Sequence, residues 1–292
     1  MTYLVSYRPQ TDDAGALALA CQFARSEAGT VHALTVVPRG WETSAGSATD
    51  GEFETWAAET GEASAAAALE LLAQEPGVTA EATWVTGRSV PAAIMEQAEK
   101  LDATLIVVGS GADGTEGRIA VSSKTDRLLH SSTVPVALAP RGYRPAPGSK
   151  ITRVTLAFRD DDITWKLLDD VADICKRVGA ELRLLTVALK HRPMVTSPVR
   201  GDEDLVFAKL VEQVKGAQVE ALEHLYKHDG LDATVDLARG ATWAEALSGV
   251  EWAEGDVLVV GSSRTHVLAN VFLGSGGAKI VRNSPVPVVV VP

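Results

Sequence analysis

Two stretches of the sequence place glycine, serine and arginine where a chain could hold a phosphate group. The longer pattern lies in "VVGSSRTHVLANVFLGSGG", residues 259–277, where a glycine ends a valine-rich run and a Gly-Ser pair follows thirteen residues later. Glycine lets backbone N–H groups approach phosphate oxygens, and a Gly-Ser pair opening a helix adds a hydroxyl group and the positive end of the helix dipole. The candidate residues are Gly261, Ser262, Ser263, Arg264, Gly274, Ser275 and Gly276.

Arg264 interrupts this pattern, and the sequence leaves two interpretations of it open. Its guanidinium group could bind a phosphate through two hydrogen bonds and replace lost backbone contacts. Alternatively, it is a surface arginine on a loop that has lost nucleotide binding, and the glycines then serve only a tight turn between strand and helix.

A second copy of the pattern lies 152 residues earlier and predicts a weaker site. The segment "LIVVGSGADGTEGRIAVSSKTDRLLHSSTVPVALAP" (105–140) aligns without a gap with "VLVVGSSRTHVLANVFLGSGGAKIVRNSPVPVVVVP" (257–292). The period is about half of the chain, which indicates duplication of a whole domain. The candidate residues of the weaker site are Gly109, Ser110, Ser122 and Ser123.

The elements that position these residues alternate between short β-branched runs and helical segments. This alternation predicts two tandem doubly wound, Rossmann-like α/β domains, each with a five-stranded parallel sheet flanked by helices. We expect domains at 1–140 and 151–292, joined by a Pro/Gly-rich linker at 141–150. The expected strands are 3–7, 31–37, 80–86, 104–109, 134–139, 152–158, 181–188, 232–238, 256–261 and 286–291. The expected helices are 13–28, 54–74, 89–100, 119–131, 162–178, 203–228, 242–252 and 271–283.

Two polar loops, 38–52 and 189–204, each follow the second strand of their half. Ligands of open α/β sheets bind at the carboxyl ends of the strands, so we expect these loops to act as lids.

The duplicated unit, the "VVGSS…LGSGG" loop and the closing "PVPVVVVP" strand resemble the universal stress protein family in its tandem two-domain form, over essentially the whole chain. Nucleotide-binding members of that family carry a Gly, two residues, Gly, nine residues and then Gly-Ser or Gly-Thr. The C-terminal half matches at Gly261, Gly274 and Ser275 and departs at Arg264. The N-terminal half matches at Gly109.

Further departures concern the N-terminal loop and an aspartate that those members carry just after the first strand. Ala112 and Ser122 stand in place of the two later glycines of the N-terminal loop, while Ser123 keeps the hydroxyl position. The aspartate is missing from both halves, where "SYRPQ" and "AFRDD" place Arg8 and Arg159. Asp160 comes one or two residues late.

The resemblance implies a stress-response or regulatory protein without catalysis. Binding of ATP or another adenine nucleotide, with Mg²⁺, is expected to be weak or absent and to lie in the C-terminal half if it occurs; a protein without a cofactor is equally compatible. A nucleotide-independent protein-interaction module is the alternative. An adenine-nucleotide enzyme of the α-hydrolase-like group is disfavoured, because neither "SYRPQTDD" nor "AFRDDDI" supplies its pyrophosphate loop.

The family's dimers also imply how the halves meet. The fifth strands, 134–139 and 286–291, are expected to pair antiparallel and form an internal pseudo-dimer, in which each covers the other's edge. A further homo-oligomer is compatible with this arrangement, and the sequence names no regulatory protein partner.

Other motifs predict neither a catalytic residue nor a metal site. His224 and His228 are four residues apart on an expected helix, but no third ligand is evident, and they are typical of a solvated helix end. The run "GSGADG" fits a dinucleotide fingerprint but follows the fourth strand, and Lys279 lacks the preceding glycine of a P-loop. Ser275 has no nucleophile elbow. The runs Asp12–Asp13 and Asp160–Asp162 are expected to cap helices.

Composition limits the partners and the compartment. A net charge of −11 argues against binding to nucleic acid or anionic membranes. The longest apolar runs are far shorter than the roughly 20 residues of a transmembrane helix. Cys21 and Cys175 are too far apart in sequence for a disulfide framework, and no signal peptide is visible, so we expect a cytoplasmic protein.

Overall fold

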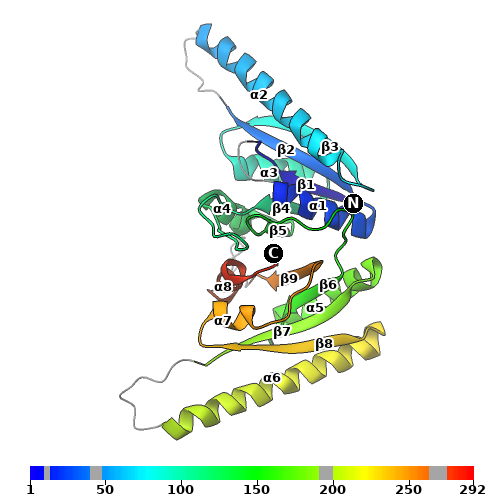
Figure 1. Cartoon of the computed structure of the whole chain (residues 1–292), viewed down its shortest axis with the longest axis vertical. Coiled ribbons are helices and arrows are strands. Elements are labelled where there is room, and N and C mark those ends of the chain that lie inside the picture. The colour runs from blue at the N-terminus through cyan, green and yellow to red at the C-terminus, as the bar shows by residue number, and fades with distance from the viewer. Residues whose placement is uncertain (10–13, 40–47, 191–199, 263–274) are drawn as a thin grey trace. The chain divides into compact units, whose positions relative to one another are not determined.

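The computed structural model describes residues 1–9, 14–39, 48–190, 200–262 and 275–292 (Figure 1). The chain divides into two compact units, and it passes from the first to the second between Lys150 and Ile151. Both units alternate strands and helices as expected. None of the helices in these described parts has the length and apolar character that a bilayer-spanning helix needs.

The first half contains a parallel sheet with the strand order β3-β2-β1-β4-β5. Its strands are β1 (Thr2–Ser6), β2 (Thr30–Pro38), β3 (Thr79–Gly87), β4 (Ala103–Gly109) and β5 (Val136–Ala139). Its helices are α1 (Ala14–Glu27), α2 (Ala48–Leu72), α3 (Val90–Lys100) and α4 (Ser123–Ser131). The middle of β1 is buried because the apolar run Tyr3–Val5 lies between two neighbouring strands.

The second half repeats this order as β8-β7-β6-β9-β10. Its strands are β6 (Arg153–Ala157), β7 (Glu181–Leu189), β8 (Ala233–Gly240), β9 (Asp256–Gly261) and β10 (Val288–Val291). Its helices are α5 (Asp162–Val178), α6 (Arg200–Asp229), α7 (Trp243–Ser248) and α8 (Ser275–Asn283). The expected fold class, two tandem α/β domains with five-stranded sheets, is confirmed.

The strand order places the ligand crevice of each half. The connection reverses direction between β1 and β4, and between β6 and β9. At such a reversal the loops at the carboxyl ends of two neighbouring strands separate and leave a crevice. Gly109 ends β4 and Gly261 ends β9, so the first residue of each candidate phosphate pattern lies at one of these two positions.

Several element boundaries differ from the sequence-based expectation. α2 begins at Ala48 and α6 at Arg200, so the later part of each expected lid is helical, while 40–47 and 191–199 lie outside the described residues. α7 ends at Ser248 rather than 252, because the chain leaves the helix at Gly249. Pairing between the fifth strands concerns the placement of the two halves relative to one another, and it stays a prediction.

The segment 141–150 packs against α1 of the first half. The Tyr143 hydroxyl donates a hydrogen bond to the Gln22 amide oxygen at 2.5 Å, and the Gln22 nitrogen donates to Ser149 Oγ at 2.9 Å. Arg25 Nε donates to the Ser149 carbonyl at 2.8 Å. This segment is therefore bound to the first half at Tyr143 and at Ser149.

Candidate functional site

A pocket of about 270 Å³ lies in the first half, at the carboxyl ends of β1 and β4 and at the starts of α3 and α4. The four residues that the sequence proposes for the weaker site all line it: Gly109, Ser110, Ser122 and Ser123. Gly109 ends β4, and Ser122 and Ser123 introduce α4. The fold thus brings together residues that the loop 110–121 separates in the sequence.

The start of α4 is set by Ser122. This residue has extended backbone angles, and its Oγ accepts a hydrogen bond from the Thr125 N–H at 3.2 Å, which is an N-cap. The helix was expected from 119, but the cap delays it to Ser123. The first N–H groups of a helix have no partner inside the helix, and together with the dipole they favour an anion. Ser123 and Lys124, in this first turn, line the pocket.

The charged side chains that line the pocket are both basic. Arg8 lies just beyond β1 and Lys124 lies in the first turn of α4, and the described lining residues include no carboxylate. This local charge is opposite to the net charge of −11 of the whole chain. The position that the sequence identifies as lacking an aspartate, at Arg8, therefore contributes a cation to the pocket.

Apolar side chains line the same pocket and form what we call its apolar wall. It consists of Val90, Pro91 and Ile94 from the start of α3 and Leu128 from α4. Ligand sites commonly combine an apolar lining with a few polar groups that fix orientation. The pocket suits a ligand with one anionic group and one flat apolar part.

The loop that follows β4 is closed by hydrogen bonds to itself. The Gly111 N–H donates to the Ala120 carbonyl, and the Ala120 N–H donates to Ser110 Oγ, both at 2.8 Å. The Arg141 guanidinium donates to the carbonyls of Ala112 and Gly114. The loop is ordered by its own contacts, and the N–H groups of Gly111 and Ala120 are already occupied.

The same contacts explain the glycines of "GSGADG". A Cβ on Gly114 would lie 2.9 Å from Ser110 Oγ and 3.0 Å from the Ala120 Cβ, and a Cβ on Gly111 would lie 3.2 Å from the Ala120 carbonyl oxygen. Glycine is needed here because the loop approaches itself closely. The motif serves loop closure, as its place after the fourth strand indicates.

The candidate site of the second half is described only at its two ends. Gly261 ends β9, where an added Cβ would meet the Leu167 side chain at 3.2 Å. Ser262 is buried, and its Oγ has no hydrogen-bond partner among the described residues. Ser275 begins α8 and Gly276 follows it. The remaining candidates, Ser263, Arg264 and Gly274, lie outside the described residues.

The aspartates after β6 take structural roles. Asp161 Oδ1 accepts hydrogen bonds from the Thr164 N–H at 2.9 Å and from the Thr164 hydroxyl at 2.8 Å, so it caps α5 as predicted. Asp160 Oδ1 accepts a hydrogen bond from the Trp165 indole N–H at 3.0 Å. These contacts give no support for either carboxylate as a substitute for the aspartate that the resemblance implies in nucleotide-binding members. The expected cap at Asp12–Asp13 lies outside the described residues.

The two cysteines are unsuited to nucleophilic chemistry. Cys21 in α1 and Cys175 in α5 are buried free thiols. Burial raises the pKa of each thiol to about 12, so the reactive thiolate is scarce at neutral pH.

Among the pocket residues that sequence reasoning missed, Lys124 bears most on the chemistry. It stands next to the serine pair in "VSSK", and a basic residue in the first turn of a helix is not expected from the helix dipole. That disagreement with the dipole is the signal that could have identified it. The wall from α3 carries no such signal, because its residues are ordinary apolar helix residues.

Comparison with known proteins identifies the family to which this chain is similar. The model described as "Universal stress protein family" matches residues 4–140 and 150–292. A universal stress protein of Mycobacterium tuberculosis is 33% identical over 296 residues, which cover 100% of both chains. A universal stress protein of Archaeoglobus fulgidus has a similar structure, with a TM-score of 0.66, 19% identity and coverage of 99% of this chain and 97% of the other. A Pseudomonas aeruginosa structure follows with a TM-score of 0.59, 17% identity and coverage of 99% and 92%.

Proposed function

Because this chain belongs to the universal stress protein family, we propose that it is a tandem, non-catalytic stress-response protein that binds an adenine nucleotide weakly in the pocket of its N-terminal half. A universal stress protein of Archaeoglobus fulgidus has been solved in complex with dAMP, so the family includes proteins that bind adenine nucleotides. The two buried free thiols favour the reducing cytoplasm as the compartment.

The observation that carries the proposal is the combination of charge and shape in this pocket. Arg8, Lys124 and the first turn of α4 provide positive charge for a phosphate group. The apolar wall around Pro91 and Ile94 provides a surface for a flat base. Both features lie within one pocket of one half.

Three features support weak rather than tight binding. The pocket volume of about 270 Å³ is just below the roughly 300–1,000 Å³ of typical ligand sites. The Gly111 and Ala120 N–H groups are used inside the loop. Arg8 stands where nucleotide-binding relatives carry an aspartate, so the hydrogen bonds that a carboxylate would accept are lost. A monophosphate fits this pocket better than a triphosphate, so we expect AMP to bind at least as well as Mg·ATP.

The lining supports a role without catalysis. The described pocket residues include serines and Lys124 but no histidine, aspartate or glutamate, which are the usual general bases that activate a serine nucleophile. Adenylation would also need an intact phosphate loop after the first strand, which neither half supplies.

The sequence pattern alone favours the C-terminal site, and in this proposal it becomes the second candidate, with residues Gly261, Ser262, Ser263, Arg264, Gly274, Ser275 and Gly276. The buried Ser262 hydroxyl supports it, because an unsatisfied buried hydroxyl is costly and a ligand could supply its partner.

Calorimetric titration of the full chain with AMP and with Mg·ATP tests the proposal. Lys124→Glu replaces one of the two cations of the N-terminal pocket by a carboxylate, whereas Gly274→Arg places a bulky side chain in the C-terminal candidate pattern. Lys215→Glu, on the exposed face of α6, is the matched charge control. We expect Lys124→Glu to weaken AMP binding by at least about tenfold, since a charged hydrogen bond is worth roughly 1.5–3 kcal/mol. The other two variants should bind AMP like the wild type.

Two results would contradict this assignment. Loss of AMP binding in Gly274→Arg but not in Lys124→Glu would move the site to the C-terminal half. No heat or stabilisation with any adenine nucleotide would favour the nucleotide-independent interaction module.

A further inference from the structure

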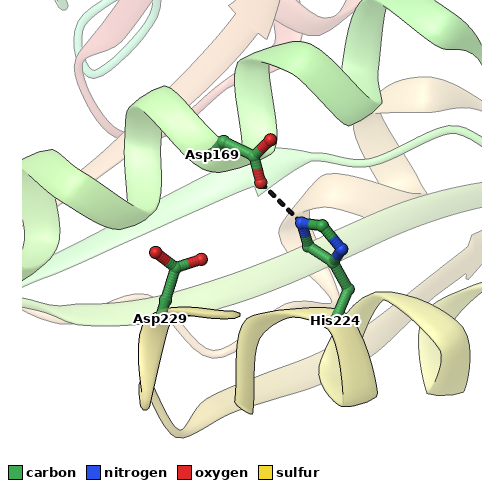
Figure 2. Close-up of side chains that lie close together, drawn as sticks. All are labelled: Asp169, His224 and Asp229. Atoms are coloured by element: carbon green, nitrogen blue, oxygen red, sulfur yellow. Dashed lines mark hydrogen bonds and ion pairs between the residues drawn. The ribbon is translucent and has the colours of Figure 1, made fainter. Parts of the chain in front are cut away.

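A cluster of possible metal ligands lies in the second half, between α5 and α6 (Figure 2). Asp169 comes from the middle of α5, while His224 and Asp229 come from the last two turns of α6. His224 Nε2 and Asp169 Oδ1 are 2.7 Å apart, and Figure 2 shows the two side chains pointing toward one another. One ligand atom of each of the three residues lies within 4.8 Å of the others.

Aromatic contacts hold the His224 ring in place. The edge of the ring meets Trp165 of α5, with centroids 5.7 Å apart and planes at 80°. The His228 ring, one turn further along α6, lies 4.6 Å from it on a tilted plane. Trp165 is itself fixed by its hydrogen bond to Asp160. The imidazole is therefore oriented before any ligand arrives, which lowers the entropy cost of binding.

We propose that Asp169, His224 and Asp229 bind a divalent transition-metal ion of the zinc type, which cross-links α5 to the end of α6. Nitrogen and carboxylate ligands suit Zn²⁺, whose bonds to them are about 2.0–2.2 Å long and arranged as a tetrahedron, so ligand atoms are separated by roughly 3.4 Å. The three atoms reach this spacing by small side-chain movements. The cluster is open to solvent at Asp169, so water takes the fourth position.

Lys176 is the group that a metal ion would displace. Its Nζ lies 2.8 Å from Asp229 Oδ1 and also 2.8 Å from Asp173 Oδ1. The ammonium group shows that this position already favours a cation. It keeps Asp173 as a partner when Asp229 turns to the metal, so the displacement leaves no charge unpaired. A network of ion pairs without a metal is the other explanation of this cluster. The experiment below distinguishes that network from a metal site.

Competition between the full-length chain and a chromogenic zinc chelator measures the affinity and stoichiometry. We expect one Zn²⁺ per chain from this site. Asp169→Asn and His224→Gln each remove one ligand and keep the size of the side chain. Each should weaken binding at this site by at least about tenfold, which is the lower end of the cost of losing even an outer partner of a metal ligand. His130→Gln, on α4 of the first half, is the matched histidine control and should leave binding unchanged.

For Lys176→Met we predict a gain in zinc affinity. It removes the competing ammonium group, and we expect tighter zinc binding than in the wild type. Thermal unfolding of each variant without metal shows whether it folds; zinc should raise the melting temperature of the wild type and of Lys176→Met, but not of His224→Gln.

The proposal is overturned if the wild type binds no zinc, or if Asp169→Asn and His224→Gln bind it as tightly as the wild type. It is also overturned if Lys176→Met does not bind zinc more tightly, since the cluster would then be an ion-pair network. These readouts do not involve nucleotides, so they are independent of the proposed function.

Discussion

Asp161 shows how a residue in a chemically suggestive position can be used for local structure. It follows the first strand of the second half, near the position where the family resemblance implies an aspartate in nucleotide-binding members. Its carboxylate instead accepts two hydrogen bonds from Thr164 and pairs with Arg159. Burial alone would raise the pKa of the Asp161 carboxyl group. The hydrogen bonds from Thr164 and Arg159 have the larger, opposite effect, so the pKa lies below its ordinary value. The carboxylate is thus stabilised in its charged form by the start of α5.

This cap predicts a pH-dependent contribution to stability. Asp161→Ala should lower the free energy of unfolding at pH 7 by about 1 kcal/mol, the usual cost of losing an N-cap. Because the folded-state pKa is depressed, the contribution is complete above the unfolded-state pKa of about 3.9 and is lost as the pH falls through the folded-state value. Urea denaturation should therefore show the gap between wild type and variant closing below pH 4.

Asp160→Ala is the control for this measurement. Asp160 is exposed and accepts a solvent-exposed hydrogen bond from the Trp165 indole N–H, so its loss should change stability by less than about 0.5 kcal/mol at pH 7. Equal losses in the two variants, or a gap for Asp161→Ala that persists at pH 2, would contradict the capping role.

Part of the residue-level picture could be predicted from the sequence, and part could not. The serines at the start of α4 and the cap at Asp161 follow from short-range patterns, because the groups that they bind are three residues away. The contact between Asp169 and His224 spans 55 residues. It depends on how α5 packs against α6, so the sequence showed His224 and His228 but no third ligand.

At the scale of elements, α2 and β3 show why a glycine can be needed inside a helix. A Cβ on Gly61 would overlap the indole ring of Trp84, which lies on β3 beneath the helix. For Gly51, on the same helix, no described atom beyond its chain neighbours and its own helix backbone lies within 4 Å of an added Cβ. The same helix therefore contains one glycine that close packing requires, Gly61, and one that it does not require, Gly51.

These two glycines predict opposite effects of the same substitution. Gly61→Ala should lower the free energy of unfolding by about 1–3 kcal/mol through overpacking against Trp84. Gly51→Ala should raise it by up to about 1 kcal/mol, because alanine is the better helix former. Thermal unfolding of both variants checks the pair. If Gly61→Ala were as stable as Gly51→Ala, the described packing of α2 on β3 would be wrong.

Element order was predictable because the hydrophobic runs and the repeat agree with one another, whereas element boundaries were less so. The expected start of α4 at 119 ignored Ser122, which satisfies the first turn only when the helix begins after it. The loop before it takes its shape from contacts between Ser110, Ala120 and Arg141, which lie up to 31 residues apart. Such contacts leave no periodic pattern in the sequence.

At the scale of the whole molecule, the duplication is the main organising feature, and the two copies have diverged. Both keep the same strand order. The sequence favours the C-terminal copy for a phosphate because it keeps more glycines, whereas our proposal favours the N-terminal copy because of its cations and its apolar wall. Arg8, just beyond β1, and Lys124 of α4 line one pocket only in the folded chain, so glycine spacing in the sequence could not reveal them.

The segment between the copies is predicted to be protected rather than free. Gln22 is fully buried and binds both Tyr143 and Ser149. Gln22→Leu removes both hydrogen bonds and should cost about 1–3 kcal/mol, because it leaves partly buried polar groups unsatisfied. Limited trypsin digestion should then cleave at Arg141 and Lys150 faster than in the wild type.

Gln218→Leu provides the control for the digestion. Gln218 is also buried, and it binds Thr186 and the Asp236 carbonyl within the second half. Its loss should reduce stability without exposing the segment 141–150. Equal cleavage of that segment in the wild type and in Gln22→Leu would show that the contacts to α1 do not hold it.

The most direct test of the central claim is an NMR titration of the labelled full-length chain with AMP, read from backbone amide shifts. We predict saturable shifts at Gly109–Ala112 and at Ser122–Thr125, around the N-terminal pocket, and no shifts of similar size at Gly261 and Ser262. Shifts confined to the end of β9 and the start of α8, or no saturable shift in either half, would contradict the account.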